Sequence, residues 1–521
     1  MQDSHGGMRL ANAVRDAYAR GQADYSMEPL VRVDAQGNAI GRIRDGDAVI
    51  FCCRRGEREI ELTDAFTAAE FPHFARAGFS DLAFVILTMY HEKYKDLPIA
   101  FAPTRGKDTL AETASKAGLR QLHCAESEKY AHVTFFLNGG NNVPPPGEDD
   151  ICIPSPKGIP FDQVPALRLP EVADTVIKGL EDGYEWIVVN FANGDVIGHT
   201  ANEKAKIECA AHVDYHLGRV LEAAKKQGYV TAITADHGNL EEMITPEGKP
   251  HVAHTSNLVP FFLIDPTADA SISLSDGSLS NIAPTALQVL GIQQPESMTG
   301  ASLASGHAFG KGRKLLLIIL DGWGIGKEDA TNPIYLAQTP VWDMLNANYS
   351  PSRLQASGEA VGLQAGKPGN SEAGHSNIGA GRVVQQDDIR LDQAMKDGSF
   401  LQNEVFLSAI DRVRKNGGAL HLLSLLTKKS SHGSIDYPLA LLQMAKDLPE
   451  VYVHIIFDGR STEPGSAPGL LEELEAQIKK IGTGQIVDGA GRGLALDRDG
   501  NYAKIEKIYA ELVQGAGVRY G

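Results

Sequence analysis

The chain has 521 residues, of which 43% are hydrophobic, and its 66 acidic against 49 basic side chains give a formal net charge of −17. So acidic a chain would repel nucleic-acid phosphates, and no apolar run approaches the ~20 residues that span a bilayer, so we expect neither nucleic acid nor a membrane as a partner. The length exceeds one ordinary hydrophobic core and predicts two domains.

The N-terminal segment and the cysteines indicate the compartment. MQDSHGGMRL does not have the charged-then-apolar order of a secretory signal. The five cysteines, at positions 52, 53, 124, 152 and 209, show neither disulfide nor zinc spacing. We therefore expect a cytoplasmic protein, and we expect a monomer.

Apolar runs of strand length alternate with helical stretches along the chain. GDAVIFCC (46–53) precedes the helical ELTDAFTAAEF (61–71) in the N-terminal hundred residues. The central region holds EWIVVNF (185–191), YVTAIT (229–234), LVPFFLI (258–264) and KLLLIIL (314–320), with apolar residues at helical spacing over 204–227. After residue 386, ALHLLSLL and YVHIIFD precede the helical NYAKIEKIYAELV. Such alternation predicts an α/β fold with a buried, doubly wound parallel sheet and a second α/β unit.

Polar clusters follow three of the central strands. Asp195 and His199 lie in NFANGDVIGHT, Asp236 and His237 in TADHGN, and Asp321 in ILDGWG, while HVAHTSN adds His251 and His254. The carboxyl ends of parallel strands share one edge of a sheet, so these side chains should converge. Carboxylates and imidazoles together suit divalent ions such as Mn²⁺ or Zn²⁺, and the number of ligands allows two. Each aspartate alone could instead cap a helix or turn.

Ser371, in KPGNSEAGHSN, is the candidate nucleophile. It could instead cap a helix, with Glu372 in the first turn. A triad would require His375 as its base, but the G-x-S-x-G elbow is missing. A neighbouring metal would activate the hydroxyl more directly, and it would leave His375 with a structural role.

Long motifs resemble those of one enzyme family. LLLIILDGWGIG, GEAVGLQAGKPGNSEAGHSNIGAGRVV, ESEKYAHVTFFLNGG, IPSPK, NFANGDVIGHT, TADHGN and KPHVAHTSN resemble the 2,3-bisphosphoglycerate-independent phosphoglycerate mutases of the alkaline phosphatase superfamily. The resemblance implies an alkaline-phosphatase-like domain plus a transferase domain. It also implies interconversion of 3- and 2-phosphoglycerate in glycolysis and gluconeogenesis through a phosphoserine, with no 2,3-bisphosphoglycerate as cofactor.

The motifs stand in a different order from the family's. There ILDGWG opens the chain and MTG-x-SL closes it, whereas here MTGASL leads through the small, polar linker ASGHAFGKG (304–312) into that strand. We therefore expect a circular permutant. Its phosphatase-like, metal-binding domain would span residues 104–385, and its transferase-like, substrate-binding domain would be split between 1–103 and 386–521. The sequence does not show whether the permutation is natural or engineered.

The resemblance also implies roles for individual residues. One metal would be held by Asp195, His199 and His254. The other would be held by Asp321, Asp236, His237 and the oxygen of Ser371, the nucleophile. Mn²⁺ is the expected ion for both sites, with Mg²⁺, Co²⁺ and Zn²⁺ as alternatives. The expected substrate-binding residues are Arg55, Arg58, Lys129, His432, Arg460, Ser461, Arg492 and Arg498, because arginine forks fit carboxylate and phosphate groups.

The transferase-like domain departs from the family pattern. Ser461 follows Arg460 where the family has an acidic residue, and serine is a poor general base. Lys428, Lys429, Ser430 and Ser431 replace an Asp-Gly-Gly-Val loop, FCCRRGER replaces FNFRxDR, and Gly493 and Leu494 replace an aromatic pair. Two alternatives to the mutase stay open: a metal-dependent phosphohydrolase of the same superfamily, and a permuted variant with impaired mutase activity, of interest for its folding or binding.

Overall fold

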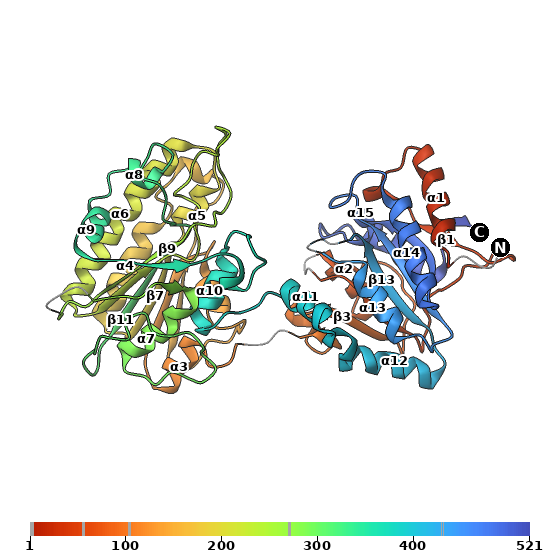
Figure 1. The fold of residues 1–521 in the computed structure, drawn as a ribbon, viewed down its shortest axis with the longest axis horizontal. Helices are drawn as coiled ribbons and strands as arrows, with labels where there is room; N and C mark the ends of the chain where they lie inside the picture. Colours follow the sequence, from red (N-terminus) through yellow and green to blue (C-terminus); the bar gives the residue numbers. More distant parts are fainter. Residues whose placement is uncertain (1–4, 55–57, 103–105, 269–271, 429, 431) are drawn as a thin grey trace. The chain divides into compact units, whose positions relative to one another are not determined.

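The computed structural model describes residues 5–54, 58–102, 106–268, 272–428, 430 and 432–521, without the side chains of residues 92 and 388. Arg55, Lys429 and Ser431, named above, lie outside the described residues. The chain forms two compact units (Figure 1): unit 1 contains residues 1–103 and 390–521, and unit 2 contains residues 104–389. No helix in the described ranges is long and apolar enough to cross a membrane.

Unit 2 is built on an eight-stranded sheet. Its strands, in spatial order, are β10 (Gly277–Ser278), β12 (Ser352–Gln355), β9 (Val259–Ile264), β8 (Val230–Thr234), β11 (Leu315–Leu320), β7 (Trp186–Phe191), β5 (Gln121–Glu126) and β6 (Glu148–Ile153). The strands from β8 to β6 are parallel, whereas β9 runs antiparallel to both of its neighbours. The expectation of a parallel strand at 258–264 is therefore wrong, because no crossover helix connects β8 to β9.

Apolar sequence explains the centre of this sheet. All six residues of β11 are buried, as the run LLLIIL predicts for a strand covered on both faces. Its register pairs Leu320 with Phe191 of β7 and Ile319 with Thr234 of β8. The three strands consequently end at nearly the same level, and the polar residues that follow them start from one edge.

Helices cover both faces of the unit 2 sheet (Figure 1). On one face, α4 (Leu169–Asp182) packs on β5 and β7, and α6 (Glu203–Lys226) packs on β8. On the other, α3 (Leu110–Lys116) contacts β5, and α7 (Ile282–Leu290) contacts β11. The remaining helices are α5 (Asn193–Gly198), α8 (Pro333–Leu336), α9 (Pro340–Asn348), α10 (Ser371–Ala380) and the π-helical turn His132–Phe136. The doubly wound arrangement predicted from the sequence is confirmed.

The segment at 304–312 lies within the connection from α7 to β11 and has no helix or strand of its own. Its first part is nevertheless held in place, because Gln288 Nε2 donates to the carbonyl oxygens of Ala304 (3.1 Å) and His307 (2.7 Å). Ala304 is buried, whereas residues 310–312 are exposed. The last part of this connection is thus an exposed loop that leads into the central strand.

Unit 1 has its own eight-stranded sheet. The spatial order is β16 (Val518–Tyr520), β1 (Leu30–Arg32), β15 (Gln485–Gly491), β14 (Val451–Phe457), β13 (Leu420–Leu426), β2 (Ala48–Phe51), β3 (Ala83–Thr88) and β4 (Ile99–Phe101). All neighbours pair in parallel except β1 and β15. The sheet therefore interleaves strands from the N-terminal and C-terminal parts of the chain.

The unit 1 helices are α1 (Gly7–Ala19), α2 (Ile60–Thr67), α12 (Glu404–Asn416), α13 (Asp436–Met444), α14 (Ala467–Ile481), α15 (Arg492–Ala495) and α16 (Tyr502–Gln514). Helix α11 (Asp387–Asp397) crosses the boundary at residue 389. A polar chain crosses the buried sheet: His421 contacts Asp47 Oδ2 (3.1 Å) and His454 (2.9 Å), and His454 contacts Asp488 (2.7 Å). Hydrogen bonds to these partners compensate for the burial of His421.

Candidate metal centre and nucleophile

The polar residues after the central strands of unit 2 lie close together. Asp321 directly follows β11, Asp195 lies in α5 behind β7, and Asp236 and His237 follow β8. All four are buried, with exposed fractions between 0% and 6%. A tight approach makes this possible: Gly322, at φ +71°, leaves room for the Asp195 backbone, because a Cβ at Gly322 would lie 2.7 Å from the Asp195 amide nitrogen.

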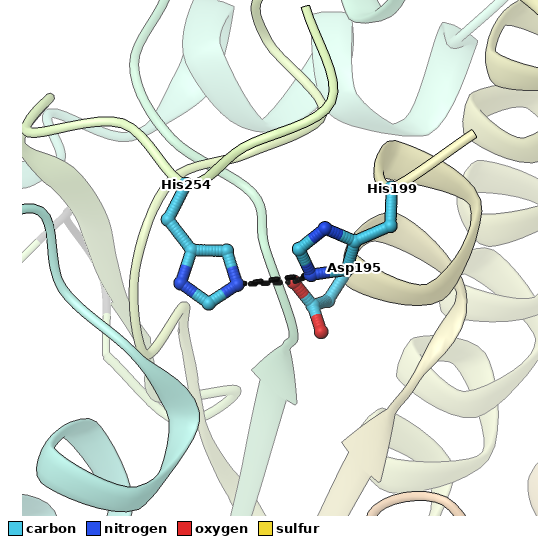
Figure 2. A group of neighbouring side chains, drawn as sticks. All are labelled: Asp195, His199 and His254. Atoms are coloured by element: carbon cyan, nitrogen blue, oxygen red, sulfur yellow. Dashed lines mark hydrogen bonds and ion pairs between the residues drawn. The ribbon is translucent and has the colours of Figure 1, made fainter. Parts of the chain in front are cut away.

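Asp195, His199 and His254 form the more open of two ligand clusters (Figure 2). Asp195 Oδ1 lies 3.2 Å from His199 Nε2 and 3.1 Å from His254 Nε2, and the two Nε2 atoms are 3.0 Å apart. The Nδ1 atoms donate to the carbonyl oxygens of Val252 and Gly369, each at 2.8 Å. These second contacts direct both Nε2 atoms at the carboxylate, as is usual for metal-binding histidines.

This cluster needs a positive charge at its centre. Two Nε2 lone pairs 3.0 Å apart, both facing one carboxylate oxygen, repel one another unless a proton or a cation lies between them. The hydrogen bond to Asp195 accordingly raises the pKa of His199, and Asp195 raises that of His254 against the effect of burial. Ligands about 2.05 Å from a tetrahedral ion lie about 3.3 Å apart, so the three atoms fit a divalent metal ion.

The second cluster is deeper in the unit. His237 Nε2 lies 3.6 Å from both Asp236 Oδ2 and Asp321 Oδ1. Asp236 Oδ2 is buried and lies 3.4 Å from His375 Nδ1, but it has no hydrogen bond from the residues that the structure describes. Burial and the neighbouring Asp236 raise the pKa of the Asp321 carboxyl. Buried carboxylates without full hydrogen bonding are costly unless a cation compensates them, so these residues also fit a metal ion.

Ser371 lies at the first position of α10, beside the second cluster. Its Oγ is 2.9 Å from His237 Nε2 and donates to Asp321 Oδ1 at 3.2 Å. The helix cap is Asn370, whose side chain accepts from the Ala373 amide, so Ser371 is not the N-cap. The positive end of the helix dipole favours negative charge on this oxygen. Gly374 allows the approach of α10, because a Cβ there would lie 2.6 Å from the Asp236 carbonyl oxygen.

His375 does not act on the Ser371 hydroxyl in this arrangement. Its Nδ1 donates to the Ser371 carbonyl oxygen at 2.9 Å, and its Nε2 contacts Asn190 Nδ2 at 3.1 Å. Both ring nitrogens are thus engaged away from the Ser371 Oγ. His375 therefore does not form a triad with Ser371 in the part of the chain that the structure describes.

Lys129, expected among the substrate-binding residues, lies between the two clusters. Its Nζ donates to Asp195 Oδ2, Asp321 Oδ1 and Ser371 Oγ, each at 2.7 Å. Burial acts to lower its pKa, but Asp321 and Asp195 raise it overall. The pKa values of the two aspartates shift in opposite directions. That of Asp321 is raised, whereas Lys129 and the imidazoles hold that of Asp195 well below the usual range although burial opposes its ionisation.

The candidate anion-binding residues of unit 1 follow the ends of its parallel strands. Arg492 is buried at the start of α15, where Nη1 donates to Asp458 Oδ1. The Arg460 guanidinium lies 4.8 Å from the Tyr25 ring centroid. Arg58 Nη1 donates to the Leu496 carbonyl oxygen at 3.2 Å. Arg460, Ser461 and Arg498 are exposed, and Arg58 and His432 are half-buried. Their roles toward a substrate stay predictions.

Three residues with clear contacts to these sites were not identified from the sequence. Asn190 donates to Asp321 Oδ2 (2.6 Å), and Asn239 donates to Asp195 Oδ1 (2.9 Å). In unit 1, Arg54 is buried and donates to the Ser430 carbonyl oxygen (2.6 Å). A signal existed for each asparagine, since Asn190 interrupts an apolar strand and Asn239 belongs to the TADHGN motif.

Family models match both parts of the chain. The model described as "Metalloenzyme superfamily" matches residues 13–294, which is more than half of the chain. The chain belongs to the metalloenzyme superfamily. In this metalloenzyme, a second model, described as "BPG-independent PGAM N-terminus", matches residues 391–520. Membership explains the paired clusters of carboxylates and imidazoles, and it indicates that the chain uses a divalent metal ion.

Relatives of this metalloenzyme bear one name. The 2,3-bisphosphoglycerate-independent phosphoglycerate mutase of Moorella thermoacetica is 45% identical over 302 residues, which are 58% of each chain. A mutase of that name from Methanosarcina acetivorans, numbered 2, is 45% identical over 293 residues and 56% of each chain. The chain thus spans just over half the length of the relatives it matches. A crystal structure of Leishmania mexicana phosphoglycerate mutase at low cobalt concentration is 29% identical, with a TM-score of 0.41 over 52% of this chain and 53% of that one.

Proposed function

We propose that this metalloenzyme interconverts 3-phosphoglycerate and 2-phosphoglycerate without 2,3-bisphosphoglycerate, through a phosphoserine at Ser371. The surroundings of the Ser371 Oγ are the observation that carries the proposal: a buried hydroxyl at a helix N-terminus, within 3.2 Å of Lys129, His237 and Asp321. The names of the relatives supply the substrate.

Two divalent ions, with Mn²⁺ preferred, belong to the proposal. Asp195, His199 and His254 would hold one, and Asp236, His237, Asp321 and the Ser371 Oγ would hold the other. Bound there, the ions would supply positive charge to a transferring phosphoryl group and lower the pKa of the serine hydroxyl. Two observations support this assignment: the paired Nε2 atoms, and Asp236 Oδ2, to which no residue in the described ranges makes a hydrogen bond.

The chain's own residues prepare Ser371 for attack. The Lys129 ammonium, 2.7 Å from the Oγ, favours the alkoxide, and the hydroxyl donates to Asp321 Oδ1 at 3.2 Å, which places that carboxylate to accept its proton. The Oγ–P bond forms while the bond from phosphorus to O3 of 3-phosphoglycerate breaks, and the leaving O3 takes up the proton that Asp321 received from Ser371. Attack by O2 of the bound glycerate on the same phosphorus then gives 2-phosphoglycerate, and the O2 proton passes by way of Asp321 to the serine oxygen that leaves.

Unit 1 would supply arginines for the anionic groups of the substrate. Arg460 and Arg498 are exposed after parallel strands, and Arg492 is held by Asp458 near the same edge of the sheet. Guanidinium groups bind carboxylates and phosphates through two parallel hydrogen bonds. Such local charge reconciles an anionic substrate with a chain of net charge −17.

An enolase-coupled assay tests this function. Activity is expected with Mn²⁺ and 3-phosphoglycerate in the absence of 2,3-bisphosphoglycerate, and it should disappear on chelation and in Ser371→Ala. Ser376→Ala provides a matched control, because it removes a hydroxyl from the same helix. Activity that persists in Ser371→Ala would refute the proposed nucleophile.

A phosphohydrolase is the second candidate function. It is suggested by Ser461, which cannot replace an acidic residue as a carrier of protons. This exposed serine follows Arg460 at the position where the family pattern has an acidic residue. Without that proton carrier, water could resolve the phosphoserine instead of glycerate. Release of inorganic phosphate faster than formation of 2-phosphoglycerate would favour this candidate over the mutase.

We also propose that the chain is circularly permuted relative to its family. In support, the model described as an N-terminus matches residues 391–520, after the match at 13–294. In addition, β11 lies between β8 and β7 although it follows both in the chain. A rearranged chain that begins at Arg313 and joins the present ends through a short Gly-Ser linker should fold and bind the same number of Mn²⁺ ions. Aggregation of that chain would count against the permutation.

A further inference from the structure

A second group of acceptor side chains lies at the edge of the unit 2 sheet, away from the metal centre. On β5 and β6 the register pairs Gln121 with Glu148 and His123 with Asp150. Residues two apart on a strand point to the same face, so these four side chains form a square on one face of the sheet. None of them belongs to the centre that contains Ser371.

The imidazole of this square has a free lone pair. His123 is fully buried, and its Nδ1 donates to the Val133 carbonyl oxygen at 2.6 Å. Burial disfavours the cationic form of a histidine, so Nε2 acts as an acceptor. It faces two more acceptors, Gln121 Oε1 at 3.4 Å and Glu148 Oε2 at 3.5 Å. The Gln121 amide cannot simply turn, because its Nε2 donates to Ala111 at 3.0 Å.

Glu148 gives the independent sign of a missing ligand. Its side chain is fully buried, and Asn138 Nδ2 donates to Oε1 at 2.6 Å, while no described residue makes a hydrogen bond to Oε2. Asp150 Oδ1 is likewise buried without a hydrogen bond from the described residues. A nitrogen of His123 and one oxygen from each carboxylate all lie within 4.8 Å of one another. Buried acceptors that converge without a donor between them require a cation or a shared proton.

We propose that His123, Glu148 and Asp150 bind a divalent transition-metal ion of the Zn²⁺ or Mn²⁺ type. One imidazole nitrogen and two carboxylate oxygens are ligands that these ions accept, and Val133 and Asn138 orient the ligands from behind. The partial exposure of Asp150 gives the ion a path from solvent. Bound there, the ion would link β6, an edge strand, to β5. The inference does not depend on the proposed mutase activity.

Elemental analysis after equilibrium dialysis against Zn²⁺ tests the site. Glu148→Gln and Asp150→Asn are nearly isosteric, and each should bind one ion fewer per chain than the wild type or bind it at least about 10-fold more weakly. Asp149→Asn is the matched control, because it removes a carboxylate of the same strand that is exposed and accepts from Tyr184 instead. It should leave the number of bound ions unchanged.

Two further measurements separate this site from the metal centre. In a chain that carries Asp195→Asn and Asp321→Asn, one Zn²⁺ ion should remain and should be lost when Glu148→Gln is added. Anomalous diffraction at the zinc edge should show a peak beside His123 Nε2. Equal zinc content in the wild type and Glu148→Gln, or density without an ion between the two carboxylates, would show a shared proton and overturn the proposal.

Discussion

Lys129 offers a direct test of the electrostatics of the metal centre. Its ammonium donates to Asp195, Asp321 and Ser371, each at 2.7 Å, and its side chain is only 6% exposed. Lys129→Met keeps an unbranched stem of similar length and removes the charge. In the metal-free protein, the change leaves two buried carboxylates without the cation that compensates them.

The expected loss of stability is large. Breaking a buried ion pair by removing one partner costs about 3–5 kcal/mol, because the remaining charge stays buried. For a unit of this size, 1 kcal/mol corresponds to about 2–4 °C in Tm, so the unit 2 transition should fall by roughly 6 to 20 °C in EDTA. Mn²⁺ should recover much of the loss, because its charge compensates the same carboxylates.

Calorimetry in EDTA and in Mn²⁺ measures both effects, with Lys206→Met as the control. Lys206 is 1% exposed, and its Nζ donates to the His251 carbonyl oxygen at 2.6 Å rather than to a carboxylate. Leaving that carbonyl unpaired costs about 1–3 kcal/mol, and Mn²⁺ should not restore it. If Lys129→Met costs no more than the control in EDTA, or if Mn²⁺ raises both variants equally, the electrostatic argument fails.

Three further predictions follow from local structure. Burial lowers the pKa of His421 to about 4, below its unfolded value of 6.5, so the unfolded chain binds more protons between these two pH values. The free energy of unfolding of unit 1 should therefore fall by about 2 kcal/mol between pH 6.5 and 5. Urea titrations should show this pH dependence in the wild type and should not show it in His421→Gln. Asn370→Ala should cost about 1 kcal/mol and reduce activity, whereas Asn403→Ala, at the cap of α12, should cost as much and leave activity intact. Gly374→Ala should displace α10 and abolish activity, because the new Cβ would meet the Asp236 carbonyl oxygen. Gly469→Ala has open space for its Cβ, so thermal unfolding should show an unchanged stability or one raised by up to about 1 kcal/mol.

The fold could be predicted from the sequence because its signals are local. The run LLLIIL marks a strand buried on both faces, and β11 has that environment. Residues after parallel strands meet at one edge, and Asp195, Asp236 and Asp321 do so. The direction of β9 had no such signal, since an apolar run looks the same in a parallel and an antiparallel strand. Only the missing crossover helix before Val259 distinguishes the two.

The position of Lys129 could not be predicted, and the reason is physical. A lysine three residues beyond a strand has a flexible stem, and its partners come from segments around residues 195, 321 and 371. The motif resemblance assigned it to substrate binding, whereas its contacts are with the candidate ligands and the nucleophile. The same limit applies to Arg54, which points inward although its motif contains three arginines.

The contacts of Lys129 also bear on how the centre tolerates the loss of metal. Without metal ions, the site contains three buried carboxylates, those of Asp195, Asp236 and Asp321. The Lys129 ammonium lies within hydrogen-bonding distance of two of them, Asp195 and Asp321. A lysine on a long stem can turn toward an incoming phosphoryl group once metal ions take over that compensation. We therefore expect Lys129→Met to weaken the binding of phosphoglycerate in saturating Mn²⁺, as measured by an increase in KM, while it lowers stability chiefly in EDTA. A variant that loses stability equally under both conditions would show that the ammonium stays with the carboxylates throughout.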